Sequence, residues 1–172
     1  EGQGGGRFLF EVQVGRRYRA LATSCPDCGP LLEYVESGAN AKAKPPVRGA
    51  EAMARARGML RGGAIVAIKG PGGYHLACDA TNAAAVRRLR TRREQGDRPF
   101  TLLVASVEAA RGFARLGPEE AALLASPRRP VVLVQRAQPG AGDAPDTVRV
   151  VDDVAPNLHE WGVMLPPSAL HV

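Results

Sequence analysis

The sequence predicts an α/β domain with its own hydrophobic core and room for a small appendage. Segments with helical spacing alternate with short apolar runs, a pattern typical of helices packed on a buried sheet. The chain has 172 residues, which is enough for one domain with a core. It contains 20 Gly and 14 Pro residues and only 5% aromatic residues, so we expect aliphatic packing and many turns. The pattern leaves open whether the sheet is parallel or mixed.

The N-terminal region predicts a hairpin followed by a linker. Apolar residues alternate from Phe8 to Val14 and Gly15 offers a turn, so a hairpin is expected over residues 8–23. Residues 36–48 are rich in Gly, Ala, Lys and Pro, which is typical of a flexible linker. We therefore place the expected domain boundary there.

Beyond the linker, helices and strands are expected to alternate. Helical spacing predicts a helix over 51–61, which two following glycines would stop. The continuous apolar run AIVAIKG, residues 64–70, predicts a buried strand. A later helix has Pro118 at a permitted first-turn position and acidic residues in its first turn. The remaining expected elements are helices over 82–93, 107–114 and 119–126, strands over 100–105, 131–136 and 161–165, and a loop over 137–146.

The charge of the chain admits three kinds of anionic partner. The net charge is +6 and the pI is about 9.8, which suits a nucleic acid, a membrane surface or a phosphate-bearing small molecule. No apolar run approaches the roughly 18 residues of a membrane span, and no signal peptide is visible. A cytoplasmic protein without a membrane partner is expected.

The three cysteines give little support for a metal centre. Cys25 and Cys28 form a C-x-x-C pair, which supplies at most half of a zinc site, and a redox pair is the alternative. Zinc would need ligands from outside this chain. Cys78 is expected to pack as a small buried residue.

The stretch VAIKGPGGYHLACDATN, residues 66–82, is the first candidate site. A strand is expected to give way here to a glycine-rich turn and a helix, where backbone N–H groups can receive phosphate. Lys69 precedes the glycines, so the pattern is neither a Walker A loop nor G-x-G-x-x-G. A plain tight turn is the competing interpretation. His75 either touches a ligand or packs, and Asp79 or Asn82 would cap the helix.

A run of arginines is the second candidate site. Residues 87–93 hold five arginines, and Arg98 follows in the loop before a strand. A solvated helix face explains some of them. Arginines close to a strand end, where ligands gather in open α/β sheets, can also pair with phosphate oxygens in bidentate fashion. SPRRP, residues 126–130, adds a hydroxyl and two guanidinium groups. The aromatic residues that usually accompany nucleic-acid binding are missing from both segments.

With these motifs assembled, the chain resembles the YrdC-like domain of HypF-type carbamoyltransferases, which act in hydrogenase maturation, and the related antibiotic O-carbamoyltransferases. KGPGGYHLACDATN matches the family's K-G-x-G-G-[FY]-H-L-x-C-D-A-x-N nearly in full. The similarity continues in order through LRTRREQGDRPFTLLV, ALLASPRRPVVLV and VAPNLHEWGVMLPPSALH. SCPDCGP resembles the last C-x-x-C-G-P of the family's zinc-finger segment. The resemblance covers about residues 17–172.

The resemblance implies a fold and a domain division. The expected fold is α/β, with a twisted mixed sheet of the YrdC-like type and a basic concave cleft. Residues 1–35 would be a remnant of the zinc-finger-like segment, residues 36–48 a linker, and residues 49–172 a YrdC-like nucleotide-binding domain lacking its C-terminal part.

The resemblance also implies a reaction and its residues. ATP with Mg²⁺ and a carbamate species or carbamoyl phosphate would give carbamoyl-adenylate and pyrophosphate, for transfer by a separate Kae1-like domain or subunit. Lys69 would be a catalytic residue at the carbamate or the α-phosphate. His75 would be a second catalytic residue, at the small-substrate end. The residues implied to bind ATP or its phosphates are Arg93, Arg98, Ser126 and Arg129.

Three departures from the family pattern stand out, and two other functions remain open. Only one of the family's four C-x-x-C pairs is present, so its two zinc sites cannot be built from this sequence. The family's K-x-R-x-x-K-P is REQGDRP here, so neutral Gln95 replaces a phosphate-binding arginine. The family's S-G-N-x-S-G segment does not occur in this sequence. The alternatives are a threonylcarbamoyl-adenylate synthase that serves tRNA modification and a non-enzymatic double-stranded-RNA-binding domain. G-G-Y-H-L-A-C-D and the upstream C-x-x-C-G-P favour the carbamoyltransferase branch.

Overall fold

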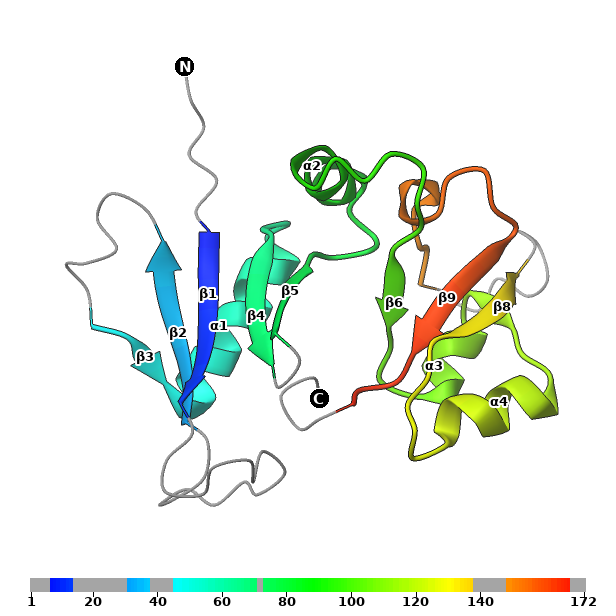
Figure 1. Ribbon diagram of the computed structural model, residues 1–172, viewed down its shortest axis with the longest axis horizontal. Helices are drawn as coiled ribbons and strands as arrows, with labels where there is room; N and C mark the ends of the chain where they lie inside the picture. Colours follow the sequence, from blue (N-terminus) through cyan, green and yellow to red (C-terminus); the bar gives the residue numbers. More distant parts are fainter. Residues whose placement is uncertain (1–6, 14–30, 38–44, 71–72, 138–147, 168–172) are drawn as a thin grey trace. The chain divides into compact units, whose positions relative to one another are not determined.

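A computed structural model describes residues 7–13, 31–37, 45–70, 73–137 and 148–167 of the chain (Figure 1). The chain divides into two compact units, Glu1–Ala85 and Val86–Val172. Each unit has its own sheet and its own buried residues. The mixed α/β fold that the sequence predicts is confirmed.

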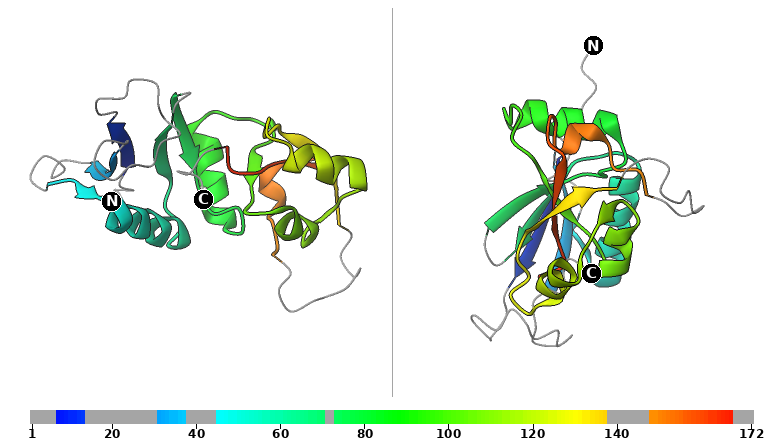
Figure 2. Two further views of the ribbon diagram at one scale, coloured as in Figure 1. Left: turned by 90° about the horizontal axis from the view of Figure 1, so that it is seen from below. Right: turned by 90° about the vertical axis from the view of Figure 1, so that its right-hand side faces the viewer.

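The first unit contains a five-stranded mixed sheet with the order β3-β2-β1-β4-β5. β1 pairs in parallel with β4, and the other neighbouring strands are antiparallel. Helix α1 lies on one face of this sheet (Figure 2). The elements are β1 (Arg7–Gln13), β2 (Leu31–Ser37), β3 (Val47–Arg48), α1 (Gly49–Arg61), β4 (Val66–Gly70) and β5 (Gly73–Ala77).

The core of the first unit forms where α1 meets β2 and β4. Ala52 and Ala56 lie four residues apart on α1, so they share a face, and both are buried. They form a cluster with Tyr34 and Val66, whose side chains are also buried. Burial, with the nearby Glu36 carboxylate as a smaller contribution, raises the pKa of the Tyr34 hydroxyl. Small alanines allow the helix to approach the sheet closely at this point.

The second unit contains a four-stranded sheet with the order β6-β9-β8-β7. β6 and β9 are parallel, and the other two pairs are antiparallel. Helix α2 begins in the first unit and continues into the second. The elements are α2 (Ala83–Arg92), β6 (Thr101–Leu103), α3 (Val107–Arg111), β7 (Ala114–Arg115), α4 (Pro118–Ala125), β8 (Val132–Arg136), the 3-10 helix η2 (Asp152–Val154) and β9 (Glu160–Met164).

Alternation along β8 and β9 defines the core face of the second sheet. Val132 lies opposite Val163, and Val134 lies opposite Trp161, and all four side chains are buried. Leu133, between the two valines, is 62% exposed. One face of this sheet is therefore packed, because successive strand residues point to opposite faces.

The predicted helices and strands from residue 51 onward correspond to elements of the structure, with two corrections. The helix expected over 107–114 ends at Arg111, because Phe113 turns into the core and β7 begins at Ala114. The structure also contains β5, the two-residue strand β7 and the 3-10 helix η2, which the sequence did not predict. The loop expected over 137–146 lies mostly outside the described residues.

The structure describes only part of the N-terminal region for which a hairpin and a linker were predicted. β1 covers the first strand of the hairpin expected over 8–23, but its antiparallel neighbour is β2, at residues 31–37. Residues 14–30, including Cys25 and Cys28, and residues 38–44 of the expected linker lie outside the described part of the chain. β1 and β2 belong to the same sheet as β4. The division into 1–35, 36–48 and 49–172 stays a prediction.

Candidate functional site

The segment around Lys69 forms a β-hairpin rather than a strand that leads directly into a helix. β4 and β5 pair antiparallel along their whole length, with Gly70 opposite Gly73. Gly73 has a φ of 116°, a conformation that favours glycine. Because β5 follows the glycines, the turn does not lie at the N-terminus of α2. The expected union of turn and helix N-terminus in one anion site is therefore wrong.

Lys69 and His75 lie on opposite faces of this hairpin. Lys69 is opposite Tyr74, and Ile68 is opposite His75. Cross-strand partners share a face and neighbours along a strand alternate. The Lys69 ammonium is 5.8 Å from the centroid of the Tyr74 ring, whereas Ile68 packs against the core cluster under α1. Since β5 is an edge strand, a ligand that contacts both residues must reach around this edge.

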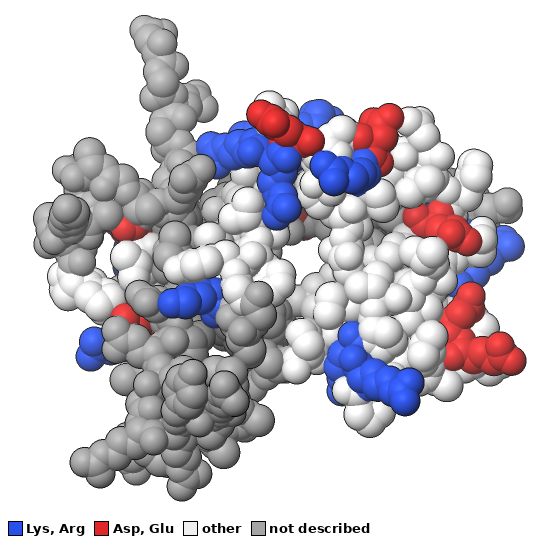
Figure 3. Space-filling view, viewed as in Figure 1, with Lys and Arg blue, Asp and Glu red and all other residues white. Residues whose placement is uncertain are grey.

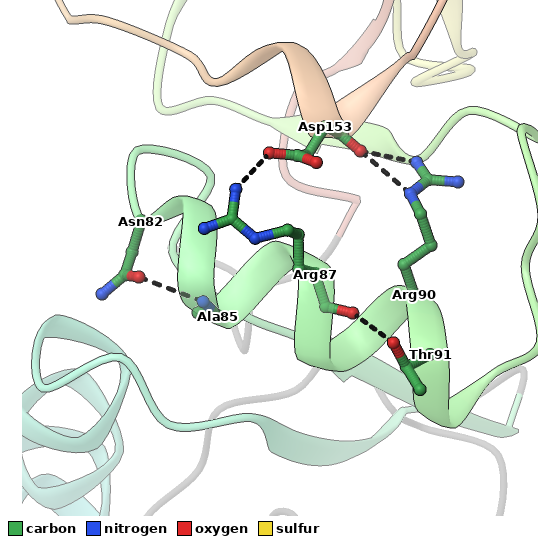
Figure 4. A network of polar contacts seen from close by, with 6 residues as sticks. All are labelled: Asn82, Ala85, Arg87, Arg90, Thr91 and Asp153. Carbon is green, nitrogen blue, oxygen red and sulfur yellow. Dashed lines mark hydrogen bonds and ion pairs between the residues drawn. The ribbon is translucent and has the colours of Figure 1, made fainter.

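Asn82 caps α2, and Asp79 shapes the turn before it. The Asn82 side-chain oxygen accepts a hydrogen bond of 3.0 Å from the amide of Ala85 (Figure 4). The Asp79 carboxylate accepts bonds of 2.8 and 2.7 Å from the amide and hydroxyl of Thr81. Of the two predicted caps, Asn82 is the one that the structure confirms. Cys78 is half-buried rather than enclosed.

Two arginines of the predicted run bind η2, although Arg87 stays exposed and Arg90 is half-buried. Arg87 and Arg90 are three residues apart on α2, so they share a face. A terminal nitrogen of Arg87 lies 3.0 Å from the Asp153 carboxylate. Nε and Nη2 of Arg90 donate to the Asp153 carbonyl at 3.1 and 2.6 Å (Figure 4). These two side chains join the helix to η2, while Arg92 and Arg93 are exposed.

Arg93 and Arg98 belong to the segment that follows α2. We call residues 93–98 the arginine loop. Glu94 and Gly96 have φ values of 49° and 58°, and the amide of Arg98 donates to the Gln95 carbonyl at 3.3 Å. The side chains of Arg93 and Arg98 are exposed. In the view of Figure 3, basic side chains gather over α2 at the top of the picture.

Ser126 and Arg129 lie between α4 and β8. The Arg129 amide donates to the Ser126 carbonyl at 3.1 Å, and Arg129 has a φ of 47°. The Ser126 hydroxyl oxygen is buried and has no hydrogen-bond partner among the described residues. A buried hydroxyl without a partner is unfavourable, so this atom is suited to a bound ligand or water.

The candidate residues are distributed over both units. Lys69 and His75 belong to the first unit, and the residues of the second unit are Arg93, Arg98, Ser126 and Arg129. Among the described residues, no group of three or more His, Cys, Asp or Glu side chains is placed to hold a metal ion. No helix in the described part of the chain is both long and apolar enough to cross a lipid bilayer.

Sequence reasoning missed the contacts that join α2 to η2. Arg90 donates to backbone carbonyls 63 and 64 residues away. Any residue type offers a carbonyl, so the sequence carries no local signal for these contacts. Helical spacing indicates only that Arg87 and Arg90 share a face.

Comparison with known proteins identifies the family. The family model described as "Telomere recombination", named for Sua5, YciO and YrdC, matches residues 58–172. The carbamoyltransferase HypF of Rhodobacter capsulatus is 41% identical over 165 residues, which cover 96% of this chain and 20% of that protein. The chain spans a fifth or less of the length of the curated relatives that it matches.

Solved structures agree with the sequence match. Full-length HypF in a phosphate- and nucleotide-bound form is 33% identical, with a TM-score of 0.70 over 91% of this chain and 18% of that chain. Sua5 of P. abyssi, in complex with L-threonine, is 22% identical, with a TM-score of 0.58 over 73% of this chain and 35% of that chain, and supports the fold alone. The family model covers more than half of the chain, so this chain belongs to the Sua5/YciO/YrdC family and contains a YrdC-like domain similar to that of the HypF carbamoyltransferases.

Proposed function

We propose that the chain is the nucleotide-binding part of a HypF-type carbamoyltransferase and forms carbamoyl-adenylate. The observation that carries the proposal is 41% identity, over nearly the whole chain, to a protein named carbamoyltransferase HypF. The nucleotide- and phosphate-bound state of a structural relative supports ATP as the ligand. A separate Kae1-like domain or subunit would receive the carbamoyl group.

In the proposed reaction, an oxygen of the carbamate attacks the α-phosphorus of ATP. The bond from that phosphorus to the bridging β-phosphate oxygen breaks, and pyrophosphate leaves with the electron pair. The protein's task is to position charged groups and to stabilise negative charge on the phosphates. Arg93 and Arg98 are suited to stabilise the negative charge on the phosphates, because both are exposed guanidinium groups on one short loop.

Lys69 and His75 are proposed to act on the reacting groups, and Ser126 and Arg129 on the nucleotide. The buried, unpartnered hydroxyl of Ser126 supports its role, because a ligand oxygen would satisfy it. Mg²⁺ would enter as part of the MgATP substrate, since this ion binds mainly through phosphates and water. Zinc at Cys25 and Cys28 stays a prediction.

Titration calorimetry with MgATP tests the proposal. We expect Lys69→Ala to weaken binding about tenfold or more, because a charge-assisted contact contributes about 1.5–3 kcal/mol. Arg61→Ala is the matched control: it also removes one positive charge of the first unit, from an exposed position at the end of α1. Absence of ATP binding by the wild type, or equal affinity of Lys69→Ala and the wild type, contradicts the proposal.

A second candidate is formation of threonylcarbamoyl-adenylate. It is favoured by the structural similarity to Sua5, a protein solved in complex with L-threonine. Pyrophosphate release from ATP distinguishes the two reactions. Release that requires carbamate, supplied by ammonium bicarbonate, supports the carbamoyltransferase proposal, and release that requires threonine and bicarbonate replaces it.

RNA binding is the non-enzymatic alternative, and the observation that favours it is the net charge of +6. A gel-shift titration with double-stranded RNA at rising salt concentration tests it. Binding that weakens steeply with salt supports the alternative, because phosphate contacts release counterions. Absence of binding at low salt rejects it.

A further inference from the structure

Arg90 joins α2 to η2. Its Nε donates to the Asp153 carbonyl at 3.1 Å, and its Nη2 donates to the same oxygen at 2.6 Å and to the Val154 carbonyl at 3.2 Å. These acceptors are backbone atoms, so the contacts fix the path of η2 rather than one side chain. Arg87, one turn earlier on the same helix, binds the Asp153 carboxylate instead.

The other side of the same guanidinium holds the arginine loop. Nη1 of Arg90 donates to the Gly96 carbonyl and, at 3.0 Å, to the Arg98 carbonyl. The guanidinium carbon lies 4.7 Å from the centroid of the Phe100 ring, and the Phe100 amide donates to the Val154 carbonyl at 2.8 Å. One side chain therefore connects the loop to both α2 and η2.

The arginine loop needs such an anchor. It has no regular secondary structure, and two of its residues have positive φ values. Four of its side chains, namely those of Arg93, Glu94, Asp97 and Arg98, are exposed, so the side chains contribute little packing. Ordering a short loop of this kind costs conformational entropy, which bonds to its carbonyls offset.

We propose that Arg90 is a positioning residue, which holds the arginine loop so that Arg93 and Arg98 are presented to a polyphosphate in one geometry. The inference rests on the proposed function, because it assigns phosphate binding to those two residues. Arg90 binds the carbonyl of Arg98 itself, so a shift of the guanidinium moves the Arg98 backbone directly. Lysine cannot replace it, since an ammonium group lacks the planar fork that serves η2 and the loop together.

Calorimetric titration with tripolyphosphate and with MgATP tests the inference. We expect Arg90→Lys to weaken binding about fivefold. Arg87→Lys should change it less than about twofold, because the Arg87 guanidinium pairs with the Asp153 carboxylate in η2. In an Arg93→Ala/Arg98→Ala background, Arg90→Lys should cause no further loss. An undiminished loss in that background overturns the inference, because Arg90 would then act without those arginines.

Hydrogen exchange gives a readout that does not depend on any ligand. The amides of residues 94–98 should exchange faster in Arg90→Lys than in the wild type and in Arg87→Lys. Gly96→Ala is a second variant that leaves Arg90 in place: Gly96 has a φ of 58°, and an added Cβ meets no atom within 4 Å. We expect it to weaken tripolyphosphate binding through backbone strain alone.

The outcomes separate the two proposals. If the wild type binds ATP but Arg90→Lys changes neither affinity nor loop exchange, this inference fails and the proposed function stands. If the wild type binds neither ATP nor tripolyphosphate, both fail. If Arg90→Lys does not fold, an unchanged affinity of Gly96→Ala overturns the inference.

Discussion

At the scale of the residue, Arg136 stabilises the second unit through contacts with three partners. Its guanidinium carbon lies 3.7 Å from the centroid of the buried Trp161 ring. One terminal nitrogen donates to the Asp152 carboxylate at 2.7 Å, and the other donates to the Ala155 carbonyl. A planar guanidinium can stack and donate at the same time, which an ammonium cannot do in the same way. Arg136 and Arg90 thus hold the η2 region from two different elements.

The contacts of Arg136 predict a measurable loss of stability on substitution. Arg136→Ala removes a stacked cation and two hydrogen bonds, so the free energy of unfolding should fall by about 2–3 kcal/mol. Gln135→Ala is the matched control: Gln135 precedes Arg136 on β8, is exposed and bonds the half-buried Glu160, so a loss of about 0.5 kcal/mol or less is expected. Urea unfolding measures both. Equal losses in the two variants would show that the stack and the bonds contribute nothing net.

At the scale of the element, burial decided which parts of the fold could be predicted. α1, α2 and α4 carry apolar residues at helical spacing with Gly, Asn or Pro at their ends, and all three were expected. β5 was missed because it is a short edge strand whose first four residues are exposed. Tyr74 and Leu76 alternate with His75, but three residues between glycines and an alanine are too short a pattern to indicate a strand. The hairpin register, which separates Lys69 from His75, could not be foreseen without β5.

Gly63, which follows α1, lies close to Asn82, which caps α2, and this contact gives a prediction about both helix ends. Gly63 has a φ of 76°, and an added Cβ would lie 2.7 Å from Nδ2 of Asn82, the cap of α2. Asn82→Ala should cost about 1 kcal/mol through the lost cap. Gly63→Ala should cost more than about 1 kcal/mol, because it adds backbone strain and a clash.

A double-mutant cycle separates strain from clash at this junction. Gly63→Ala should cost less in an Asn82→Ala background, since the contacted amide is then absent. Gly62→Ala is the control, because Gly62 has an ordinary φ of −74° and its Cβ would meet only atoms at 3.4 Å or beyond. Thermal unfolding of Gly63→Ala, Asn82→Ala and the double variant, each compared with the wild type, gives the three differences in the free energy of unfolding. If the losses of the two single variants add up to the loss of the double variant, there is no clash, and the loss in Gly63→Ala comes only from backbone strain at positive φ.

At the scale of the whole molecule, the sequence predicted the class of fold and the net positive charge, but not where that charge acts. The α/β class was anticipated from the alternation of helical and apolar segments, and the mixed sheet and YrdC-like fold from motif similarity. Which arginines of the run bind η2 was not anticipated, because it depends on pairings across more than 60 residues. A net charge of +6 could attract a phosphate from any side of the molecule.

Salt dependence distinguishes attraction by the whole molecule from binding at the arginine loop. Arg93→Ala/Arg98→Ala and Arg61→Ala/Arg115→Ala each remove two exposed positive charges, so they lower the net charge equally. If the loop binds the phosphates, only the first double substitution should weaken tripolyphosphate binding and flatten its dependence on NaCl between about 50 and 300 mM, where screening shortens from more than 10 Å to a few ångströms. If the overall field dominates, both pairs should change affinity and slope to the same extent. Equal slopes would remove the arginine loop as the phosphate site, and with it the role proposed for Arg90.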